Sequence, residues 1–236
     1  MRINKYIAMC GVCSRRKAEE LVLQGKIKVN GKVIDNLGTD INEENDTVML
    51  DNVKIFIVTK KEYIMFHKPK GCICSLSDEK DRKTIMDYLT DFDGKKIFPV
   101  GRLDYDTEGL LLLTNDGEFS NKLTQPINEI PKTYIAIVDG ELTSNDVGIL
   151  RGGMVIDGVK LRKSKVKILE NENNQSRVEI TIYEGKNRQV RKMFDCIGKN
   201  VILLRRIKIG DLKLGGLTRG TYRYLTNKEV SDLLKL

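Results

Sequence analysis

What this chain of 236 residues lacks excludes several classes of protein. Its apolar runs are of strand length, such as Leu110 to Leu113, whereas a helix that crosses a bilayer needs roughly 20 apolar residues. The first sixteen residues contain neither an uninterrupted apolar stretch nor the small-residue cleavage site of a secretory signal. The sequence also shows no internal repeat and no low-complexity tract. We therefore expect a globular cytoplasmic protein without a membrane span.

Metal ligands are also scarce in the sequence. The five cysteines include one pair with zinc-like spacing, Cys10 and Cys13, but the second pair, Cys72 and Cys74, is separated by a single residue. The chain has one histidine, His67, and a structural zinc site needs about four nitrogen or sulfur ligands. We therefore expect ordinary reduced cysteines and no bound metal.

Basic residues, by contrast, are abundant. The formal net charge is +8 and the isoelectric point about 9.1, which favours polyanionic partners, although a lysine-rich surface alone gives the same total. The signs are segregated in the first 59 residues: 1–34 carry eight Lys/Arg against two Glu, and 35–59 carry one Lys against six acids. A randomly solvated surface would mix the two signs, so the basic segment is a candidate surface for an anion.

The first 59 residues have the turn and capping signals of a small unit. Apolar residues at helical spacing begin at Ile3, and Ser14 is a good N-cap for a second helix that Gly25 ends. Asn30-Gly31 between two short apolar runs predicts a hairpin, and Asp51-Asn52 predicts another. The pattern predicts two helices followed by two hairpins.

The second of these helices begins with three cations, Arg15, Arg16 and Lys17. Cations in the first turn oppose the helix macrodipole at a cost of a few tenths to about 1 kcal/mol each. On an exposed helix, salt screens this unfavourable interaction and makes its cost small. One interpretation is therefore that the helix simply tolerates the three cations. The other is that the cations, together with free backbone N–H groups of that turn, bind an external phosphate.

Residues 2–50 resemble an S4 RNA-binding domain, a family with an αL-like helix pair and small hairpin that contact structured RNA. The resemblance covers the whole core pattern of that family, and we place the domain at residues 1–59. It implies that the basic residues of this segment bind RNA. The candidates are Arg2, Lys5, Arg15, Arg16, Lys17, Lys26 and Lys28.

From residue 60 the pattern changes to alternating strands and helices. Helices are expected after Thr84 and over 186–197. Strands are expected over 63–66, 133–138, 178–183, 201–209 and 222–225. Strands outnumber helices and follow one another at short spacing, which predicts a mixed, mostly antiparallel α+β sheet in a second domain over 60–236.

The densest polar cluster in the chain is the segment 101–109, GRLDYDTEG, which four leucines follow. We expect its carboxylates, Asp104, Asp106 and Glu108, on a loop fixed to a buried strand, a common placement for catalytic groups. Alternating acids also open calcium-binding loops, but Asn115 stands where such a loop needs a bidentate glutamate, which excludes calcium. The acids can instead close turns, as we expect of Asp106. The third interpretation is that one aspartate is a nucleophile.

Residues 101–119, GRLDYDTEGLLLLTNDGEF, closely resemble the signature of the small-subunit-type and B-type ribosomal RNA pseudouridine synthases. Other segments resemble further motifs of that family: 63–71 (YIMFHKPKG), 184–193 (EGKNRQVRKM), 204–210 (LRRIKIG) and 220–225 (GTYRYL). Together with the S4-like segment, the resemblance covers nearly the whole chain. His67 is a small departure, because many relatives have Asn or Tyr there.

The resemblance also implies residue roles. Asp104 would be the catalytic nucleophile, and Arg191, with Arg188 second, would be the cation that keeps it ionised. Tyr134 would stack on the flipped uracil and deprotonate C5 late in the reaction. Without the resemblance, Arg191 is a surface cation of a helix and Tyr134 a half-buried strand tyrosine. Isomerisation has no redox or phosphoryl step, so we expect no cofactor.

Basic residues surround these motifs. Residues 186–208 hold eight Lys/Arg against one acid, and a second basic stretch lies at 160–167. Candidates for phosphate contacts are Arg102, Lys186, Arg188 and Arg205. No aromatic ladder is interleaved with them, so we expect recognition of folded RNA and not of single strands.

The sequence as a whole predicts a monomeric enzyme that isomerises a uridine of ribosomal RNA, free or in a pre-ribosomal particle. The motif segments look closest to the B-type group, which favours large-subunit (23S) RNA over small-subunit (16S) RNA. Two alternatives stay open. A non-catalytic RNA-binding or ribosome-assembly factor would not need Asp104, and a methyltransferase would need a glycine-rich nucleotide-binding turn that the sequence lacks.

Overall fold

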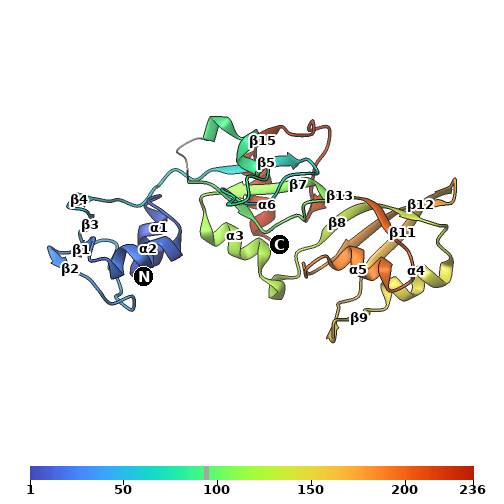
Figure 1. Ribbon diagram of the computed structural model, residues 1–236, viewed down its shortest axis with the longest axis horizontal. Coiled ribbons are helices and arrows are strands. Elements are labelled where there is room, and N and C mark those ends of the chain that lie inside the picture. Colours follow the sequence, from blue (N-terminus) through green and yellow to red (C-terminus); the bar gives the residue numbers. More distant parts are fainter. Residues whose placement is uncertain (93–95) are drawn as a thin grey trace. The chain divides into compact units, whose positions relative to one another are not determined.

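The computed structural model describes residues 1–92 and 96–236 and divides the chain into two compact units (Figure 1). The first comprises Met1–Glu62 with short pieces of 92–97 and 115–117, and the second contains the remaining residues. The domain boundary that we place after residue 59 stays a prediction. In the described part of the chain, no helix combines the length and the apolar character that crossing a membrane requires.

The first unit packs two short helices with a small antiparallel sheet. Its helices are α1 (Ile3–Met9) and α2 (Arg15–Leu23), and its strands are β1 (Ile27–Val29), β2 (Lys32–Val33), β3 (Val48–Leu50) and β4 (Val53–Lys54). The strand order is β2-β1-β3-β4. The core contains Ile3 and Ile7 of α1, Val22 of α2, and Ile27 and Val48 of the sheet, all fully buried.

The local signals of this unit form as predicted. The Ser14 side chain accepts a hydrogen bond from the Lys17 N–H and caps α2. Asn30 and Gly31 both have positive φ, and so do Asp51 and Asn52, as two-residue hairpin turns require. The apolar run 53–58 contributes only two residues to a strand.

A nine-stranded mixed sheet forms the second unit. Its main path runs β11-β12-β8-β13-β7-β5-β15, while β14 pairs with β13 and β6 with β7. The strands are β5 (Tyr63–Lys68), β6 (Phe98–Val100), β7 (Glu108–Thr114), β8 (Lys132–Asp139), β11 (Lys165–Glu172), β12 (Gln175–Ile182), β13 (Val201–Ile209), β14 (Leu212–Lys213) and β15 (Tyr222–Tyr224). A separate small hairpin consists of β9 (Val155–Ile156) and β10 (Val159–Lys160). Only β7 and β13 pair in parallel; the other strand pairs of the described sheet are antiparallel.

Helices connect these strands and cover the sheet. They are α3 (Gly117–Thr124), α4 (Ser144–Arg151), α5 (Gln189–Asp195) and α6 (Asn227–Leu234), with 3₁₀ turns at Ile85–Tyr88, Thr90–Phe92 and Pro126–Asn128. The helix predicted over 186–197 is wrong at its start, because Arg188 adopts the left-handed conformation and α5 begins at Gln189. The helix predicted after Thr84 is a 3₁₀ turn with a capping box.

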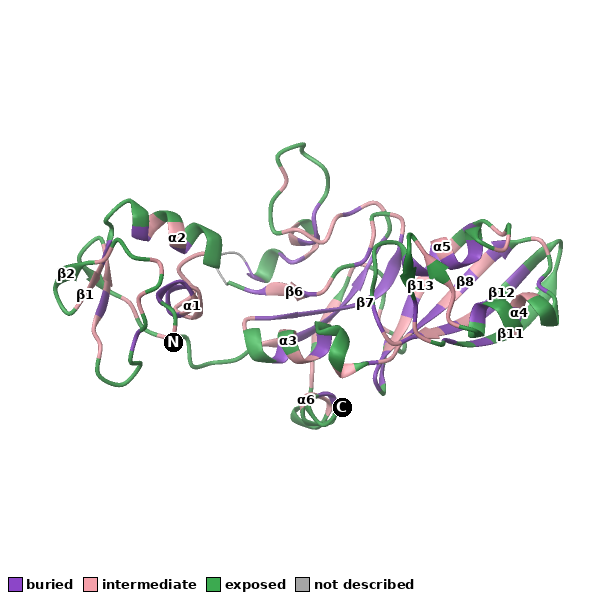
Figure 2. Cartoon of the chain, turned by 90° about the horizontal axis from the view of Figure 1, so that it is seen from below, coloured by how far each residue is buried: buried purple, intermediate pink, exposed green. Residues whose placement is uncertain are grey.

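Strand β7 lies at the centre of the core, buried along its whole length (Figure 2). Leu110 and Leu112 pack with Phe119 of α3 and Leu233 of α6. Leu111 lies on the other face opposite Phe66, whose ring is 6.1 Å from that of Tyr88. Because both faces are covered, the strand has four consecutive leucines and not an alternating pattern.

Candidate active site

The acidic segment forms the connection between β6 and β7. These strands pair antiparallel, and the loop 101–107 joins their neighbouring ends. Gly101 enters the loop at positive φ, and the Thr107 N–H donates to the Asp104 carbonyl, which closes a turn. The expectation of three loop carboxylates is wrong for one of them, because Glu108 is the first residue of β7 and 1% exposed.

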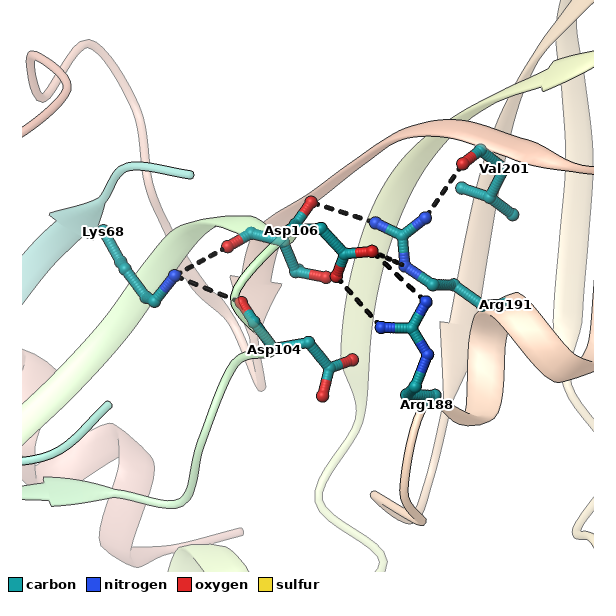
Figure 3. Close-up of polar contacts among 7 residues, drawn as sticks. Lys68, Asp104, Asp106, Arg188, Arg191 and Val201 are labelled. Carbon is teal, nitrogen blue, oxygen red and sulfur yellow. Dashed lines mark hydrogen bonds and ion pairs between the residues drawn. The ribbon is translucent and has the colours of Figure 1, made fainter. Parts of the chain in front are cut away.

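Lys68, at the end of β5, fixes the path of this loop. Its fully buried ammonium donates to the carbonyl oxygens of Pro69 at 3.0 Å, Asp104 at 3.1 Å and Thr107 at 3.0 Å (Figure 3). Three acceptors satisfy the three donors of an ammonium group. Burial lowers the pKa of Lys68, against the opposing effect of nearby thiols and carboxyls. The loop backbone at Asp104 is therefore held by a side chain from another strand.

Asp106 is clamped by two arginines of the α5 region. Arg188 donates to both of its carboxylate oxygens at 3.2 Å, and the Arg191 Nε lies 3.2 Å from Oδ2 (Figure 3). Partial burial acts to raise the pKa of Asp106, but the Arg188 hydrogen bond and the two positive charges outweigh it and leave the pKa below its usual range. Asp106 is thus an ionised residue that connects the loop to the two arginines, in addition to being part of the turn.

Arg191 is the centre of this clamp and is only 7% exposed. One terminal nitrogen donates to the Val201 carbonyl of β13 at 2.8 Å, and the other donates to the Asp106 carbonyl at 2.9 Å. The role of Arg191 as the cation that keeps Asp104 ionised stays a prediction; the ion pair that Arg191 forms in the structure is with Asp106. Arg191 is a buried residue and not a surface cation.

Asp104 differs from Asp106 in its surroundings. Among the residues that the structure describes, no hydrogen bond or ion pair engages the Asp104 carboxylate, and in Figure 3 no dashed line reaches its carboxylate oxygens. Asp104 is half-buried and lines a cavity of about 320 Å³. This volume is at the lower end of the roughly 300–1,000 Å³ typical of small-ligand sites.

The cavity brings several predicted residues together. Tyr134, 8% exposed on β8, lines it with Asp104, and the exposed residues Arg102, Lys186 and Arg188 line it as well. Arg191 is not among its lining residues. Two cations that sequence reasoning missed, Lys132 and Arg206, are part of the lining.

Arg205 does not lie in this cavity, and its charge is engaged elsewhere. It donates to the buried Glu108 carboxylate at 2.5 Å, and Arg219 reaches the other carboxylate oxygen at 2.9 Å. We expected Arg205 to contact RNA, but in the structure it partners a buried acid at the start of β7. The signal in the sequence that could have predicted this ion pair is the glutamate at the start of the leucine-rich strand, because a buried carboxylate needs a cation as its partner.

The basic residues predicted for the first unit are mostly exposed there. Arg15, Arg16, Lys17 and Lys26 are exposed, and Lys5 and Lys28 are half-buried. Some have partners within the unit: the exposed Arg2 lies 3.3 Å from Asp40, Lys17 lies 2.6 Å from Glu20, and Lys28 donates to Asn52 at 2.8 Å.

The cysteine pair of the first unit has no metal-ligand cluster around it. Within the described residues, no group of three His, Cys, Asp or Glu side chains is placed to hold an ion. Burial raises the pKa of the Cys10 thiol to about 11, against the effect of its hydrogen bond with Tyr6. A metal-binding cysteine must be a thiolate, and this environment favours the protonated thiol.

Comparisons with known proteins agree with this geometry. The family model for RNA pseudouridylate synthase matches residues 62–195, and that for the S4 domain matches 1–48. The chain is 44% identical, over all of its length and 96% of the relative, to "Ribosomal large subunit pseudouridine synthase B" of Bacillus subtilis. It is 34% identical, over the full length of both, to "Ribosomal small subunit pseudouridine synthase A" of Haemophilus influenzae. A solved structure described as a pseudouridylate synthase matches with a TM-score of 0.72, 32% identity and 99% coverage of both chains.

Proposed function

This chain belongs to the RNA pseudouridylate synthase family and carries an S4 domain, and from this premise we propose that it isomerises a uridine of large-subunit ribosomal RNA with Asp104 as nucleophile. The observation that carries the assignment is the contrast between two neighbouring carboxylates. Asp106 is bound by Arg188 and Arg191, whereas Asp104 faces the cavity that Tyr134 also lines. The carboxylate that can reach a substrate carbon is the one without a protein partner.

The arrangement suits covalent catalysis. Lys68 holds the Asp104 carbonyl, and the Asp106 clamp fixes the loop two residues further on, so the nucleophile is presented from a rigid loop. A carboxylate attacks only when it is ionised, and Arg188 and Arg191 place positive charge close by. We assign Arg191 a positioning and electrostatic role through Asp106.

The remaining cavity residues have roles that fit a flipped nucleotide. Tyr134 offers an aromatic ring to the base and a hydroxyl that can take the C5 proton. The exposed Arg102, Lys186 and Arg188 are placed to meet the phosphates on either side of the extruded uridine. The exposed cations of the S4 domain, Arg15 and Arg16, would hold a neighbouring RNA segment.

The choice of large-subunit RNA rests on similarity. The relative named for the large subunit is 44% identical to this chain, and the one named for the small subunit 34% identical. A ribosomal RNA substrate also implies a cytoplasmic reaction, and we propose that the protein acts as a monomer, because a complete site is built from one chain.

The test is to incubate purified protein separately with 23S RNA and 16S RNA from a strain that lacks the enzyme. Pseudouridines are then mapped at single-nucleotide resolution. We expect one new site in the 23S RNA and none in the 16S RNA. A new site only in the 16S RNA would reassign the substrate. RNA binding without a new site in either RNA, or in pre-ribosomal particles, would favour the assembly-factor alternative.

A further inference from the structure

Two cations of the cavity lie on the same face of the sheet as Tyr134. Lys132 is two residues before Tyr134 on β8, and alternate residues of a strand share a face. Arg206 of β13 is in register with Tyr134 across the antiparallel pair, which places both side chains on that face. All three residues line the cavity that Asp104 lines.

Neither cation has a counter-charge among the described residues; Arg206 is buried and Lys132 is half-buried. Arg206 is 4% exposed; its Nε donates to the Leu110 carbonyl at 2.7 Å, but one terminal nitrogen is buried and has no partner among the described residues. The Lys132 ammonium donates to the Ile130 carbonyl at 2.9 Å, and no carboxylate of the described chain pairs with it. Burial, with the charge of Arg206, lowers the pKa of Lys132 to about 8.

Unpaired buried charges destabilise a fold, and a donor without an acceptor adds to that cost. Arg206 and the half-buried Lys132 both lack a carboxylate partner among the described residues, and both line one cavity, which indicates a ligand that supplies negative charge. Phosphates can be met by the exposed Arg102, Lys186 and Arg188. The part of the cavity next to Tyr134, whose ring we assign to the base, is where the uracil itself would lie.

We propose that Lys132 and Arg206 stabilise the uracil anion that is released when Asp104 attacks the ribose. This inference rests on the proposed function and adds two catalytic residues to it. Uracil is neutral in the bound substrate and carries negative charge only once its bond to the ribose is breaking. Cations that face it therefore interact more strongly with the transition state than with the ground state, and this difference accelerates the reaction.

The bond changes are balanced without a further reactant. An Asp104 oxygen forms a bond to C1′ while the C1′–N1 bond breaks, and the electron pair stays on N1 with its charge spread over O2 and O4. After the base turns, C5 attacks C1′ and Asp104 leaves as a carboxylate. C5 loses its proton, for which Tyr134 is the nearby acceptor, and N1 gains a proton, so the product is an isomer of the substrate.

Single-turnover rates on two RNA substrates test the proposal. One RNA carries uridine at the target position and the other carries 5-fluorouridine, whose electron-withdrawing fluorine makes the base a better leaving anion. Breakage of the glycosidic bond is followed as loss of the intact nucleoside after nuclease digestion. Lys132→Met should lower the rate on uridine by about 10²-fold, the size of effect seen when one charge-stabilising donor is removed. The fall on 5-fluorouridine should be smaller, and RNA affinity should be unchanged.

Two variants control for folding. Lys132→Arg restores a positive charge and should recover most of the lost rate. Lys132→Met removes a charge that burial disfavours, so its melting temperature at neutral pH should equal or exceed that of the wild type. This gain should hold below about pH 8, the folded pKa, and shrink as the pH rises toward the ordinary value of 10.5. Arg206→Lys keeps the charge but shortens its reach. Its single-turnover rate should fall on the uridine RNA and fall less on the 5-fluorouridine RNA, as expected for Lys132→Met.

Other results would overturn the proposal. Equal falls on both substrates would show that Lys132 does not act on the leaving base. Weaker RNA binding at an unchanged single-turnover rate would show a phosphate contact. A slow Lys132→Met variant with a lower melting temperature and no recovery in Lys132→Arg would show a structural role. If the wild-type protein breaks no glycosidic bond in either RNA, the proposed function itself is wrong. The three preceding results, by contrast, would overturn only the roles of Lys132 and Arg206.

Discussion

At the scale of single residues, two aspartates separated by one residue have different surroundings. Asp106 is held by Arg188 and Arg191, while the Asp104 carboxylate faces a cavity. The sequence motif indicates that both acids matter, but it does not tell which arginine binds which acid. In the structure the guanidinium groups of Arg188, at the start of α5, and of Arg191, within it, meet the same carboxylate, that of Asp106.

Asp106→Asn tests the clamp. The amide keeps the shape of the carboxylate but removes its charge, so we expect about 1 kcal/mol less unfolding free energy at neutral pH and an activity loss of about ten-fold. The pKa of Asp106 is lowered in the folded chain, so the stabilisation is complete above the ordinary value of 3.8 and is lost as the pH falls through the folded pKa. The difference between variant and wild type, measured by denaturant unfolding, should therefore vanish in acid.

A matched control for this variant is Asp157, in the turn between β9 and β10, which also pairs with a cation of α5. Asp157 pairs with Lys192 of α5 at 2.5 Å, but Asp157 is 70% exposed. Asp157→Asn should leave stability and activity within error, because exposed ion pairs contribute little. Equal effects of Asp157→Asn and Asp106→Asn would show that the two arginines add nothing specific.

At the scale of elements, the parallel contact of β7 with β13 brings the acidic loop and the buried Arg206 together. Gly109 of β7 is opposite Arg206 of β13, and its φ of +114° lies in a region that favours glycine. A Cβ at Gly109 would overlap the backbone oxygen and nitrogen of Arg206. Only a residue without a side chain lets the two strands approach here, directly beside Lys68 and the Asp104 loop.

Gly109→Ala should therefore displace β13 or unfold the unit. We expect a loss of at least about 3 kcal/mol in unfolding free energy, since both the backbone conformation and the strand contact are lost. Gly117→Ala, at the start of α3, is the control, because a Cβ there meets nothing within 4 Å. A Gly109→Ala protein with wild-type stability and activity would show that the β7–β13 contact does not build the site.

The elements that sequence reasoning found and those it missed differ in their local signals. The hairpins of the first unit are predicted because Asn30-Gly31 and Asp51-Asn52 set the turn by themselves. The eight-residue helices α3, α4 and α6 were not predicted, although Thr143 of α4 and Thr226 of α6 each form a capping box with the acid three residues further on. Short helices contain too few turns to show periodicity, and their stability comes from packing that the sequence does not display.

Prediction of the site from the sequence is limited in the same way, because contacts between distant strands are not visible in the sequence. Asp104 and Tyr134 are predicted from the family resemblance, and in the structure both line one cavity. Lys132 and Arg206 are more than 70 residues apart in the sequence, and only the β8–β13 register brings them together. No local pattern contains that register, so these two cavity cations could not be predicted.

At the scale of the whole molecule, we propose different roles for two segments in which positive charge is concentrated. Residues 1–34 hold eight Lys/Arg and 186–208 hold eight more. The first set lies in the S4 unit and the second follows the catalytic motifs. If the S4 unit holds RNA through phosphates, its cations should determine affinity and its salt dependence, whereas the second set should affect catalysis as well.

Arg15→Ala combined with Arg16→Ala tests this division. We expect the affinity for ribosomal RNA to fall about ten-fold or more and the slope of log affinity against log salt to become shallower by one to two, because fewer counterions are released. Folding should be unaffected, since both side chains are exposed. Lys228→Ala with Lys235→Ala removes the same charge from the C-terminal region and is the control. Equal losses in the two double variants would reveal a net-charge effect in place of an S4 contact.

The central claim is that Asp104 attacks the substrate, and pseudouridine formation by Asp104→Asn measures it most directly. The amide preserves size and shape but cannot act as the nucleophile, so turnover on ribosomal RNA from an enzyme-deficient strain should fall to background. RNA binding, measured in parallel, should match the wild type, because the phosphate contacts belong to other residues. Substantial pseudouridine formation by the Asp104→Asn protein, with the label confirmed at the wild-type site, would contradict the account.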